Sequence, residues 1–306
     1  TYSITPDPCY AILDVVVDGI SHGAIPSYTF SNVNSDHSIV ASFVLLTYSV
    51  TASAGPNGTI TLSGINTVNC GDSISFSITP DTCYQILDVV VDGISQGALS
   101  TFTFASVQTS HTIQATFSKI SYTISVSAGS GGSISPSGSV SVFCGDDQSF
   151  IIQPDTCFVI GDVLIDGISQ GPISSWTFTS VTGNHTISAT FNLINYTLHS
   201  SSGLHGSITP DGDVIRGCGS DQHYSFAPDS CYEISDVIVD GVSQGVQADW
   251  TFNSIGSNHS ISVSYALRSY TINASGGLHG SISPAGNSIV NCGDSLTITF
   301  VADTCY

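Results

Sequence analysis

The segment CYQILDVVVDGIS at residues 83–95 decides the fold, because near copies of it return at a fixed interval along the chain. The Cys-aromatic pair that opens it occurs at Cys9-Tyr10, Cys83-Tyr84, Cys157-Phe158, Cys231-Tyr232 and Cys305-Tyr306. Each step is 83 − 9 = 74 residues, with no insertion or deletion. A fixed period of this kind predicts a tandem array of similar units, although length alone would suggest two or three separate domains.

The period sets the predicted domain boundaries. Complete repeats occupy 47–120, 121–194 and 195–268, while 1–46 is the back part of a repeat and 269–306 the front part of another. A partial repeat would leave strand edges and half a core uncovered. We therefore expect the array to continue, either in a longer chain or head to tail in a neighbouring copy, which makes self-association the expected partnership.

Apolar residues alternate with hydroxyl residues within each repeat, as in Tyr122-Thr-Ile-Ser-Val126 and Trp176-Thr-Phe178. A period of two is typical of β-strands, and the Asp166-Gly167 pair is a hairpin signal. No stretch has helical periodicity. The sequence predicts an all-β protein, a tandem array of small antiparallel β-sandwich-like domains of six or seven strands. The domains are expected to touch directly, because no Pro/Gly/Ser linker separates them.

The composition excludes several function classes. The chain has 3 Lys+Arg against 23 Asp+Glu, and a net charge of -20 repels nucleic-acid phosphates. No apolar run approaches the ~18 residues that a membrane span needs. The 41% hydrophobic content is too high for a disordered acidic tail. Nine cysteines in a Ser/Thr-rich chain without methionine indicate an oxidising, extracellular or cell-surface location.

With these segments in view, the repeat resembles the divergent internalin-type B-repeat of large bacterial secreted and cell-surface proteins. The matching segments are YTISVSAGSGGSISPSG at 122–138, the C-G-D to F-x-I-x-P run at 144–154, and 162–191. The resemblance implies an all-β module with a surface or extracellular role in a bacterium. It implies no catalytic motif, and the sequence lacks G-x-S-x-G, H-E-x-x-H and P-loop motifs, so neither enzymatic activity nor a cofactor is expected.

The cysteines are expected to form structural disulfides, because they lack the spacing of metal sites. The candidates are Cys9, Cys70, Cys83, Cys144, Cys157, Cys218, Cys231, Cys292 and Cys305. Three pairings stay open: local (83 − 70 = 13), between repeats (144 − 83 = 61), and a longer one from Cys70 to Cys157 (157 − 70 = 87). A straight strand between Cys70 and Cys83 would hold them about 20 Å apart, too far for the local bond. Nine is odd, so Cys9 or Cys305 lacks a partner within this chain.

Other recurring polar residues are weaker candidates. Paired aspartates could bind calcium, but the second of each pair is expected to initiate an Asp-Gly turn. These pairs are Asp88 and Asp92, Asp162 and Asp166, and Asp236 and Asp240. A recurring histidine could bind metal or sense pH, but it more simply opens the last strand of each repeat. It occurs at His37, His111, His185 and His259, while His205 and His279 fall in a Gly-Leu-His-Gly turn.

Two further groups of residues relate to glycans. Trp176 and Trp250 could stack on sugar rings, but alternation with Phe178 and Phe252 favours packing in the core. Asparagines in N-x-[ST] sequences are possible glycosylation sites, at Asn57, Asn184, Asn195, Asn258 and Asn273.

Three functional hypotheses follow from these patterns. The favoured one is a structural segment of a bacterial extracellular stalk or filament, stiffened by disulfides and by direct contact between repeats. The alternatives are an adhesin or carbohydrate-binding array, whose repetition would provide avidity, and an accessory region of a larger secreted protein. Lys–Asn isopeptide cross-links are not expected, because Lys119 is the only lysine.

Overall fold

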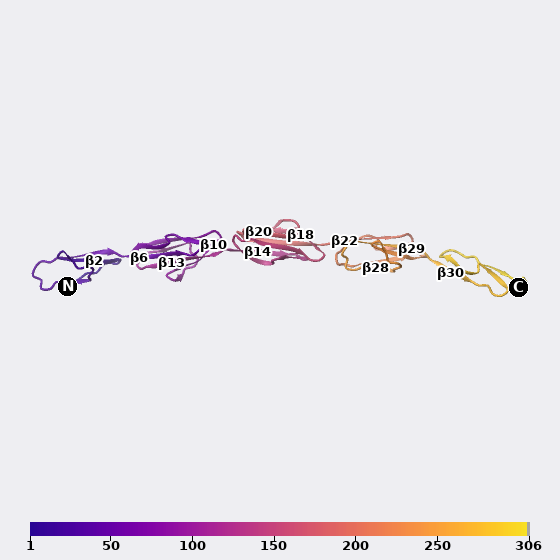
Figure 1. The fold of residues 1–306 in the computed structure, drawn as a ribbon, viewed down its shortest axis with the longest axis horizontal. Helices are drawn as coiled ribbons and strands as arrows, with labels where there is room; N and C mark the ends of the chain where they lie inside the picture. Colours follow the sequence, from indigo (N-terminus) through magenta and orange to yellow (C-terminus); the bar gives the residue numbers. More distant parts are fainter. Residues whose placement is uncertain (305–306) are drawn as a thin grey trace. The chain divides into compact units, whose positions relative to one another are not determined.

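The structure is a computed structural model that describes residues 1–304. All regular structure in that range is β-strand, drawn as arrows in Figure 1, and none of it is helical. No helix long and apolar enough to cross a membrane is therefore found there. Contacts group the chain into two compact parts, whose boundary runs through the repeat at 121–194. The predicted all-β fold class is confirmed.

The repeat at 47–120 consists of two facing sheets. One sheet has five strands in the order β11-β10-β13-β6-β8, and the other has three in the order β12-β9-β7. The strands are β6 (Thr47–Ala54), β7 (Gly58–Ile60), β8 (Gly64–Asn69), β9 (Ile74–Pro80), β10 (Tyr84–Val91), β11 (Ile94–Ser95), β12 (Thr101–Phe104) and β13 (His111–Lys119).

Apolar side chains from both sheets fill the space between them. Phe76 and Ile78 of β9 are buried, while the alternating Ser75, Ser77 and Thr79 are exposed, as the period of two predicts. They join a core that includes Val50, Val89 and Ile113 of the larger sheet. This repeat therefore has its own core, which a sandwich of two sheets requires, and so does the repeat at 195–268.

Strand pairing differs from a purely antiparallel sandwich in one respect. β6 and β13, the first and last strands of the repeat, are neighbours and run parallel, with His111 opposite Val50 and Ala115 opposite Ala54. β10 with β11 and β13, β9 with β12 and β7, and β6 with β8 are all antiparallel. The larger sheet is therefore mixed, and the chain enters and leaves the repeat through adjacent strands.

The repeat at 195–268 has the same arrangement. Its sheets have the orders β24-β22-β29-β26-β27 and β23-β25-β28, and β22 runs parallel to β29. The strands are β22 (Asn195–Ser202), β23 (Gly206–Thr209), β24 (Gly212–Gly217), β25 (Gln222–Pro228), β26 (Tyr232–Val239), β27 (Val242–Ser243), β28 (Asp249–Phe252) and β29 (His259–Leu267).

The repeat at 121–194 contains the corresponding strands. β18 pairs with β19 and β21, and β15 pairs with β17, all antiparallel. The strands are β14 (Ser121–Ala128), β15 (Gly132–Ser135), β16 (Gly138–Phe143), β17 (Gln148–Pro154), β18 (Phe158–Ile165), β19 (Ile168–Ser169), β20 (Ser175–Phe178) and β21 (His185–Leu193).

The two partial repeats carry shorter sheets. In 1–46, β2 pairs with β3 and β5, and β1 pairs with β4; in 269–304, β30 pairs with β32 and β31 with β33. The strands are β1 (Tyr2–Ser3), β2 (Tyr10–Val17), β3 (Ile20–Ser21), β4 (Ser27–Tyr28), β5 (Ile39–Leu45), β30 (Ser269–Ala274), β31 (Gly280–Ser283), β32 (Gly286–Asn291) and β33 (Thr299–Ala302).

A β-bulge recurs in β2, β10, β18 and β26, the strands that begin at the aromatic residue of a Cys-aromatic pair. In β10 the register with β13 shifts between Ile86 and Asp88, and the extra residue, Leu87, is 59% exposed. A bulge inserts one residue without a partner and so reverses the inward and outward positions after it. Val89 and Val91 consequently face the core, while Asp92 follows the strand in a tight turn with a φ of 50°.

Candidate functional site

The joints between repeats are the most regular polar feature of the chain. A single residue separates the last strand of one repeat from the first strand of the next. At the joint after β13, the N–H of Ile120 donates to the carbonyl oxygen of Cys83 at 2.9 Å, and its own carbonyl accepts from the N–H of Cys144 at 2.8 Å. The same two hydrogen bonds occur at Leu46, Ile194 and Arg268. The connecting residue is thus held from both sides by the two cysteines of its joint.

Disulfides close these joints. The structure pairs cysteines of consecutive repeats, 61 residues apart, with Cα atoms 5.2 to 5.4 Å from each other. The bonds are Cys9–Cys70, Cys83–Cys144, Cys157–Cys218 and Cys231–Cys292. Of the three pairings that the sequence leaves open, this is the one between repeats. Cys305 lies outside the described residues.

The backbone explains why the local pairing is absent. β9 occupies most of the chain between Cys70 and Cys83, and its seven residues span about 23 Å. The second cysteine sits in a turn closed by the N–H of Tyr84 and the carbonyl of Asp81. Cys83 adopts a φ of 68° in that turn, in the left-handed region that L-residues rarely occupy. The turn therefore places the Cys83 sulfur at the joint that lies at the opposite end of β9 from Cys70.

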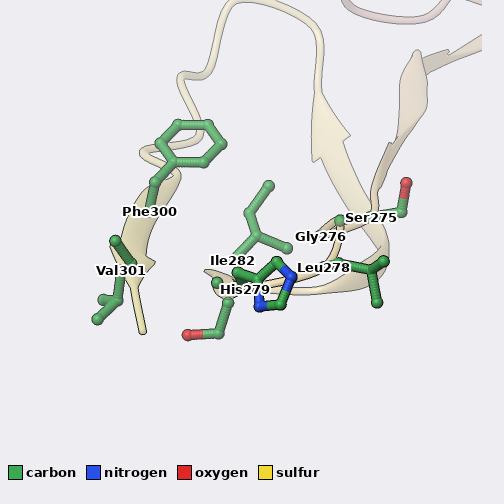
Figure 2. A pocket seen from close by; sticks show the side chains of 11 residues that line it. Ser275, Gly276, Leu278, His279, Ile282, Phe300 and Val301 are labelled. Carbon is green, nitrogen blue, oxygen red and sulfur yellow. The ribbon is translucent and has the colours of Figure 1, made fainter. Parts of the chain in front are cut away.

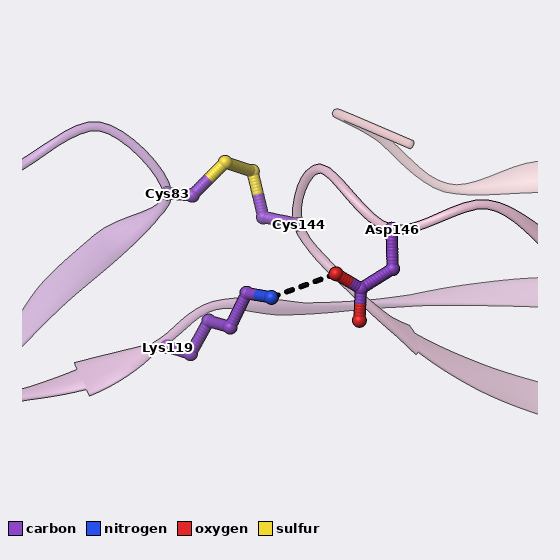
Figure 3. Close-up of a disulfide and its surroundings, with 4 residues drawn as sticks. All are labelled: Cys83, Lys119, Cys144 and Asp146. Atoms are coloured by element: carbon purple, nitrogen blue, oxygen red, sulfur yellow. Dashed lines mark hydrogen bonds and ion pairs between the residues drawn. A yellow bond between two sulfur atoms is a disulfide. The ribbon is translucent and has the colours of Figure 1, made fainter. Parts of the chain in front are cut away.

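One joint also carries an ion pair, shown beside its disulfide in Figure 3. The Nζ of Lys119 lies 2.8 Å from a carboxylate oxygen of Asp146 and 5.5 Å from the ring centre of Phe143. Leu45, Leu193 and Leu267 occupy the position of Lys119 in the other repeats. Because both charged groups are partly exposed, this pair contributes little beside the disulfide.

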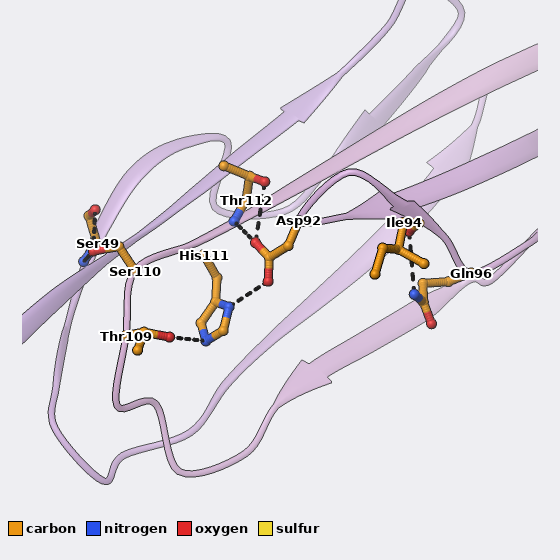
Figure 4. Close-up of polar contacts among 8 residues, drawn as sticks. All are labelled: Ser49, Asp92, Ile94, Gln96, Thr109, Ser110, His111 and Thr112. Carbon is orange, nitrogen blue, oxygen red and sulfur yellow. Dashed lines mark hydrogen bonds and ion pairs between the residues drawn. The ribbon is translucent and has the colours of Figure 1, made fainter.

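Aspartate and histidine form a second recurring contact, shown for one repeat in Figure 4. The Nδ1 of His111 lies 2.6 Å from one carboxylate oxygen of Asp92, and the other oxygen accepts the N–H of Thr112 at 2.7 Å. The His111 ring stacks on Phe104 with centroids 4.7 Å apart. Equivalent pairs join Asp18 to His37 and Asp240 to His259. Each pair fastens the hairpin after one strand to the start of the last strand.

These contacts shift the pKa of the aspartates. Partial burial raises the pKa of Asp92, but hydrogen bonds from the N–H of Thr112 and from His111 outweigh it, so the net pKa is lowered. The pKa of Asp240 is lowered by the same balance of causes. For Asp18 the largest cause is the N–H of Ser38, followed by His37, and the pKa is again lowered. The carboxylates are therefore held in their charged form.

The first aspartate of each candidate metal pair has a different set of partners. Asp88 accepts the Ser95 hydroxyl at 2.8 Å and the Gly97 N–H at 3.0 Å, and thereby holds the loop after β11. Asp14, Asp162 and Asp236 make the corresponding bonds. Asp166 accepts the N–H of Thr186, as Asp92 accepts that of Thr112. Within residues 1–304, no three histidine, cysteine or acidic side chains gather at a spacing that would hold a metal ion.

Each tryptophan lies on an edge strand of the three-stranded sheet of its repeat, next to the middle strand. Trp250 is directly across from Tyr224, half-buried, and packs against the core of its repeat, 6.2 Å from Phe252. Trp176 is also half-buried. This placement gives Trp250 a packing role. No convergent set of polar side chains for a sugar accompanies it in the described contacts.

The asparagines of the N-x-[ST] sequences fall into two groups. The side-chain oxygens of Asn184 and Asn258 accept the N–H of Thr123 and Thr197, at the start of β14 and β22. Asn195 and Asn273 donate to Leu193 and Asn287. Asn57 is exposed in a turn, with a φ of 73°. The other four asparagines are exposed as well, so all five remain candidate modification sites.

Two of the hollows in the surface are uncovered core of the partial repeats. Figure 2 shows one of about 350 Å³ in the partial repeat 269–304, lined by Leu278, His279, Ile282 and Phe300 among others. Phe300 is 77% exposed, whereas Phe226 at the same position of a complete repeat is 8% exposed. A second hollow lies in 1–46, beside Tyr2, Phe30 and His37. Neither has the enclosed apolar wall with aimed polar groups that small-molecule sites have.

Sequence reasoning considered the aspartates and histidines separately and missed that they meet. The available signal was their constant separation, 111 − 92 = 19 residues, which is repeated as 37 − 18, 185 − 166 and 259 − 240. It also missed the two hydrogen bonds of the connecting residue. No side-chain pattern marks that residue, because both bonds use main-chain atoms.

Comparisons with known proteins place these observations in context. No curated protein sequence matches the chain at a significant level. The TIE protein of Bacillus anthracis is similar in structure at 7% identity and a TM-score of 0.40, over 84% of this chain and 68% of that one. A tandem of titin domains I9–I11 is similar at 7% identity and a TM-score of 0.12, over 72% of this chain and 99% of that one. Neither likeness is close enough to bear on function.

A family model gives the sharper match. The model of the divergent InlB B-repeat domain, a repeat domain and not a known enzyme family, matches residues 48–121, which coincide to within one residue with a repeat defined by the 74-residue period. The other complete repeats are copies of that segment at the same period. The protein is thus a tandem β-repeat protein with four disulfides among residues 1–304. The predicted resemblance to the divergent internalin-type B-repeats is confirmed, and residues 48–121 are the repeat that matches the family.

Proposed function

We propose that this chain is a structural segment of a bacterial extracellular or cell-surface protein, and that it forms a stiff stalk or filament. The observation that carries the proposal is the construction of the joints. Consecutive repeats are connected twice, by the main chain through one residue and by a disulfide. Two covalent connections, with hydrogen bonds between them, restrict bending and twisting at a joint far more than a single flexible linker does.

Two observations support the location. All eight cysteines among the described residues are joined in disulfides, a state that persists in oxidising compartments and is rare in the bacterial cytosol. The matched family is the divergent InlB B-repeat domain, and the resemblance implies a surface or secreted setting. Both support an extracellular or surface role for this chain.

The use of the polar side chains supports a scaffold. Asp88, Asp92 and His111 are engaged in holding loops and strands of their own repeat, and their counterparts do the same elsewhere. The hollows of the two partial repeats lie where core positions are uncovered. A repeated structural role explains why these residues recur in every copy.

Electron microscopy tests the mechanical part of the proposal. The purified chain is compared with a version that carries two extra copies of residues 121–194, each with and without a reducing agent. Straight particles that lengthen in proportion to the number of repeats, and that bend more after reduction, are expected. Compact particles whose length does not follow the repeat number would refute the stalk. Self-association is examined on the same grids as end-to-end joining of particles.

Antibody labelling of intact cells tests the location. An antibody against residues 121–194 should label intact bacteria that produce the protein, and permeabilisation should add little signal. Labelling that requires permeabilisation would place the protein inside the cell and would overturn the surface role. A cytosolic protein of the same cells serves as the control for cell integrity.

A further inference from the structure

The disulfides give the chain an unusual covalent layout. Each bond closes a ring that runs from the second cysteine of one repeat to the first cysteine of the next, such as 83–144. The rings are 9–70, 83–144, 157–218 and 231–292. They do not overlap. Between successive rings the chain is single, over the segments 70–83, 144–157 and 218–231.

Each connecting segment is already nearly extended. The segment from Cys70 to Cys83 consists of β9 with a short turn at either end, and β17 and β25 occupy the same place in the next two segments. β9 is the middle strand of its sheet, between β7 and β12, and β25 is the middle strand between β23 and β28. The segment that joins two rings is therefore a strand supported by a neighbour on both sides.

We propose that these strands and disulfides form a continuous covalent cable, which carries tension along the array and keeps the rings out of the path of the force. The cable enters at Cys9, crosses to Cys70, follows β9 to Cys83, and crosses to Cys144. It repeats this course through β17 and β25 and leaves at Cys292. A ring closed at its base by a disulfide cannot be pulled open by its two ends, because the sulfurs hold those ends about 5 Å apart.

The covalent layout fixes how far the array can stretch. A chain extends by at most about 3.5 Å per residue, so each ring of 144 − 83 = 61 steps hides about 210 Å of chain. From Cys9 to Cys292 the unbridged chain has 292 − 9 = 283 steps and would reach about 1,000 Å. Through the cable, three segments of 83 − 70 = 13 steps and four disulfides reach about 160 Å. The fully stretched bridged array is therefore about six times shorter than the unbridged chain.

The covalent layout also affects how the array recovers after it has been stretched. A repeat with an unbridged chain would lengthen by more than 200 Å when it unfolds under tension, and would have to refold over that distance. A bridged repeat lengthens only through the short segment that joins two rings. That segment has 13 steps and already contains an extended strand, so full stretching adds about 25 Å to its length. The array is therefore close to inextensible even when its sheets come apart.

Single-molecule force spectroscopy on the full 306-residue chain, held at its two ends, tests the cable. Reduction should lengthen the fully stretched chain by four times about 210 Å, and between Cys9 and Cys292 the oxidised chain should show no unfolding step larger than about 25 Å. The measurement reports covalent connectivity and extension only. It is independent of location and assembly, so the surface role can fail while the cable stands. Local pairing of the cysteines would remove the cable and the disulfides of the joints together, whereas particles that bend freely in electron microscopy would contradict the stalk and leave the cable intact.

Variants identify the individual rings. The double variant Cys83→Ser with Cys144→Ser should lengthen the oxidised chain by one step of about 210 Å, and Cys157→Ser with Cys218→Ser should add another. Stretched length depends on bonds and not on stability, so a less stable variant still gives a result. Lys119→Leu is the matched control, because it removes the ion pair at the same joint and introduces the leucine of other repeats. It should leave the length unchanged.

Two results would overturn the proposal. If reduction lengthened the stretched chain by only about 45 Å per disulfide, the cysteines would be paired locally within 13-residue segments. Oxidised chains that unfold in steps above 200 Å would show that the rings carry the force. Either outcome is readily resolved from the expected one.

Discussion

Tyr224 offers a sharp test of the packing in this protein. Its side chain is fully buried in the repeat 195–268, and its hydroxyl has no hydrogen-bond partner in the structure. Phe76 and Phe150 fill the same position in the two preceding repeats, with exposures of 1% and 0%. The core thus closes around a phenylalanine in its sister repeats, and the Tyr224 hydroxyl adds a polar group without adding a bond.

The Tyr224→Phe variant should therefore be more stable. Leaving a buried hydroxyl without a partner costs about 1–3 kcal/mol, so we expect a gain of about 1–2 kcal/mol after a small loss of packing. With a urea dependence of about 1 kcal/mol per molar for a domain of this size, the midpoint of unfolding of this repeat should rise by about 1 M.

Fluorescence can report on this repeat alone. Trp250 lies directly across from Tyr224, and Trp176 is the only other tryptophan. In a Trp176→Phe background, which introduces the residue found at Phe102, the emission comes from Trp250 only. The converse variant, Phe76→Tyr, should destabilise its own repeat and leave the Trp250 transition unchanged. A Tyr224→Phe midpoint that is unchanged or lower would refute the reasoning and show that the hydroxyl is satisfied.

Further predictions concern a close contact, a charge and a bridge. In Gly132→Ala the new Cβ would lie 2.3 Å from the Phe191 ring, so thermal unfolding should show a loss of about 1–3 kcal/mol, whereas Gly183→Ala, with nothing within 4 Å, should be near neutral. Hydrogen bonds lower the pKa of Asp92 in the folded protein below its unfolded value of 3.8. The Asp92 carboxylate therefore stabilises the fold fully above pH 3.8, and this stabilisation is lost as the pH falls through the lower pKa of the folded state. Asp92→Asn should thus unfold at a lower temperature than wild type at pH 7, with the difference shrinking below pH 4; a constant difference would contradict this. Removing Cys83 and Cys144 together should cost about 4 kcal/mol in urea titrations, from the chain entropy of a ring closed over 61 residues.

The sequence predicted the fold class because its strongest signals are local and repeated. The alternation around Phe76 and Ile78 and the Asp92-Gly93 turn act over a few residues, and the 74-residue period repeats them in each copy. The parallel pairing of β6 with β13 could not be predicted in this way. Alternation identifies which side of a strand faces the core, but not the direction of its neighbour.

The joints were only partly predictable for a different reason. The length of the strand before Cys83 argued against a local bond, but the choice between the remaining registers depends on how the next repeat is placed. The Asp92–His111 contact joins residues on either side of an intervening loop, and neither residue type alone distinguishes a turn from a pair. Such contacts belong to the tertiary structure, and spacing is the only trace they leave in one sequence.

The connecting residue has a consequence for how such arrays change over generations. Leu46, Ile120, Ile194 and Arg268 occupy the same place, and all make the same two bonds through their main-chain atoms. An arginine serves there as well as an aliphatic residue, so the junction places little demand on the identity of that side chain. Since the other requirement is one cysteine from each side, any copy can follow any other. Unequal crossing-over between the copies would then add or remove whole 74-residue repeats and leave every junction intact.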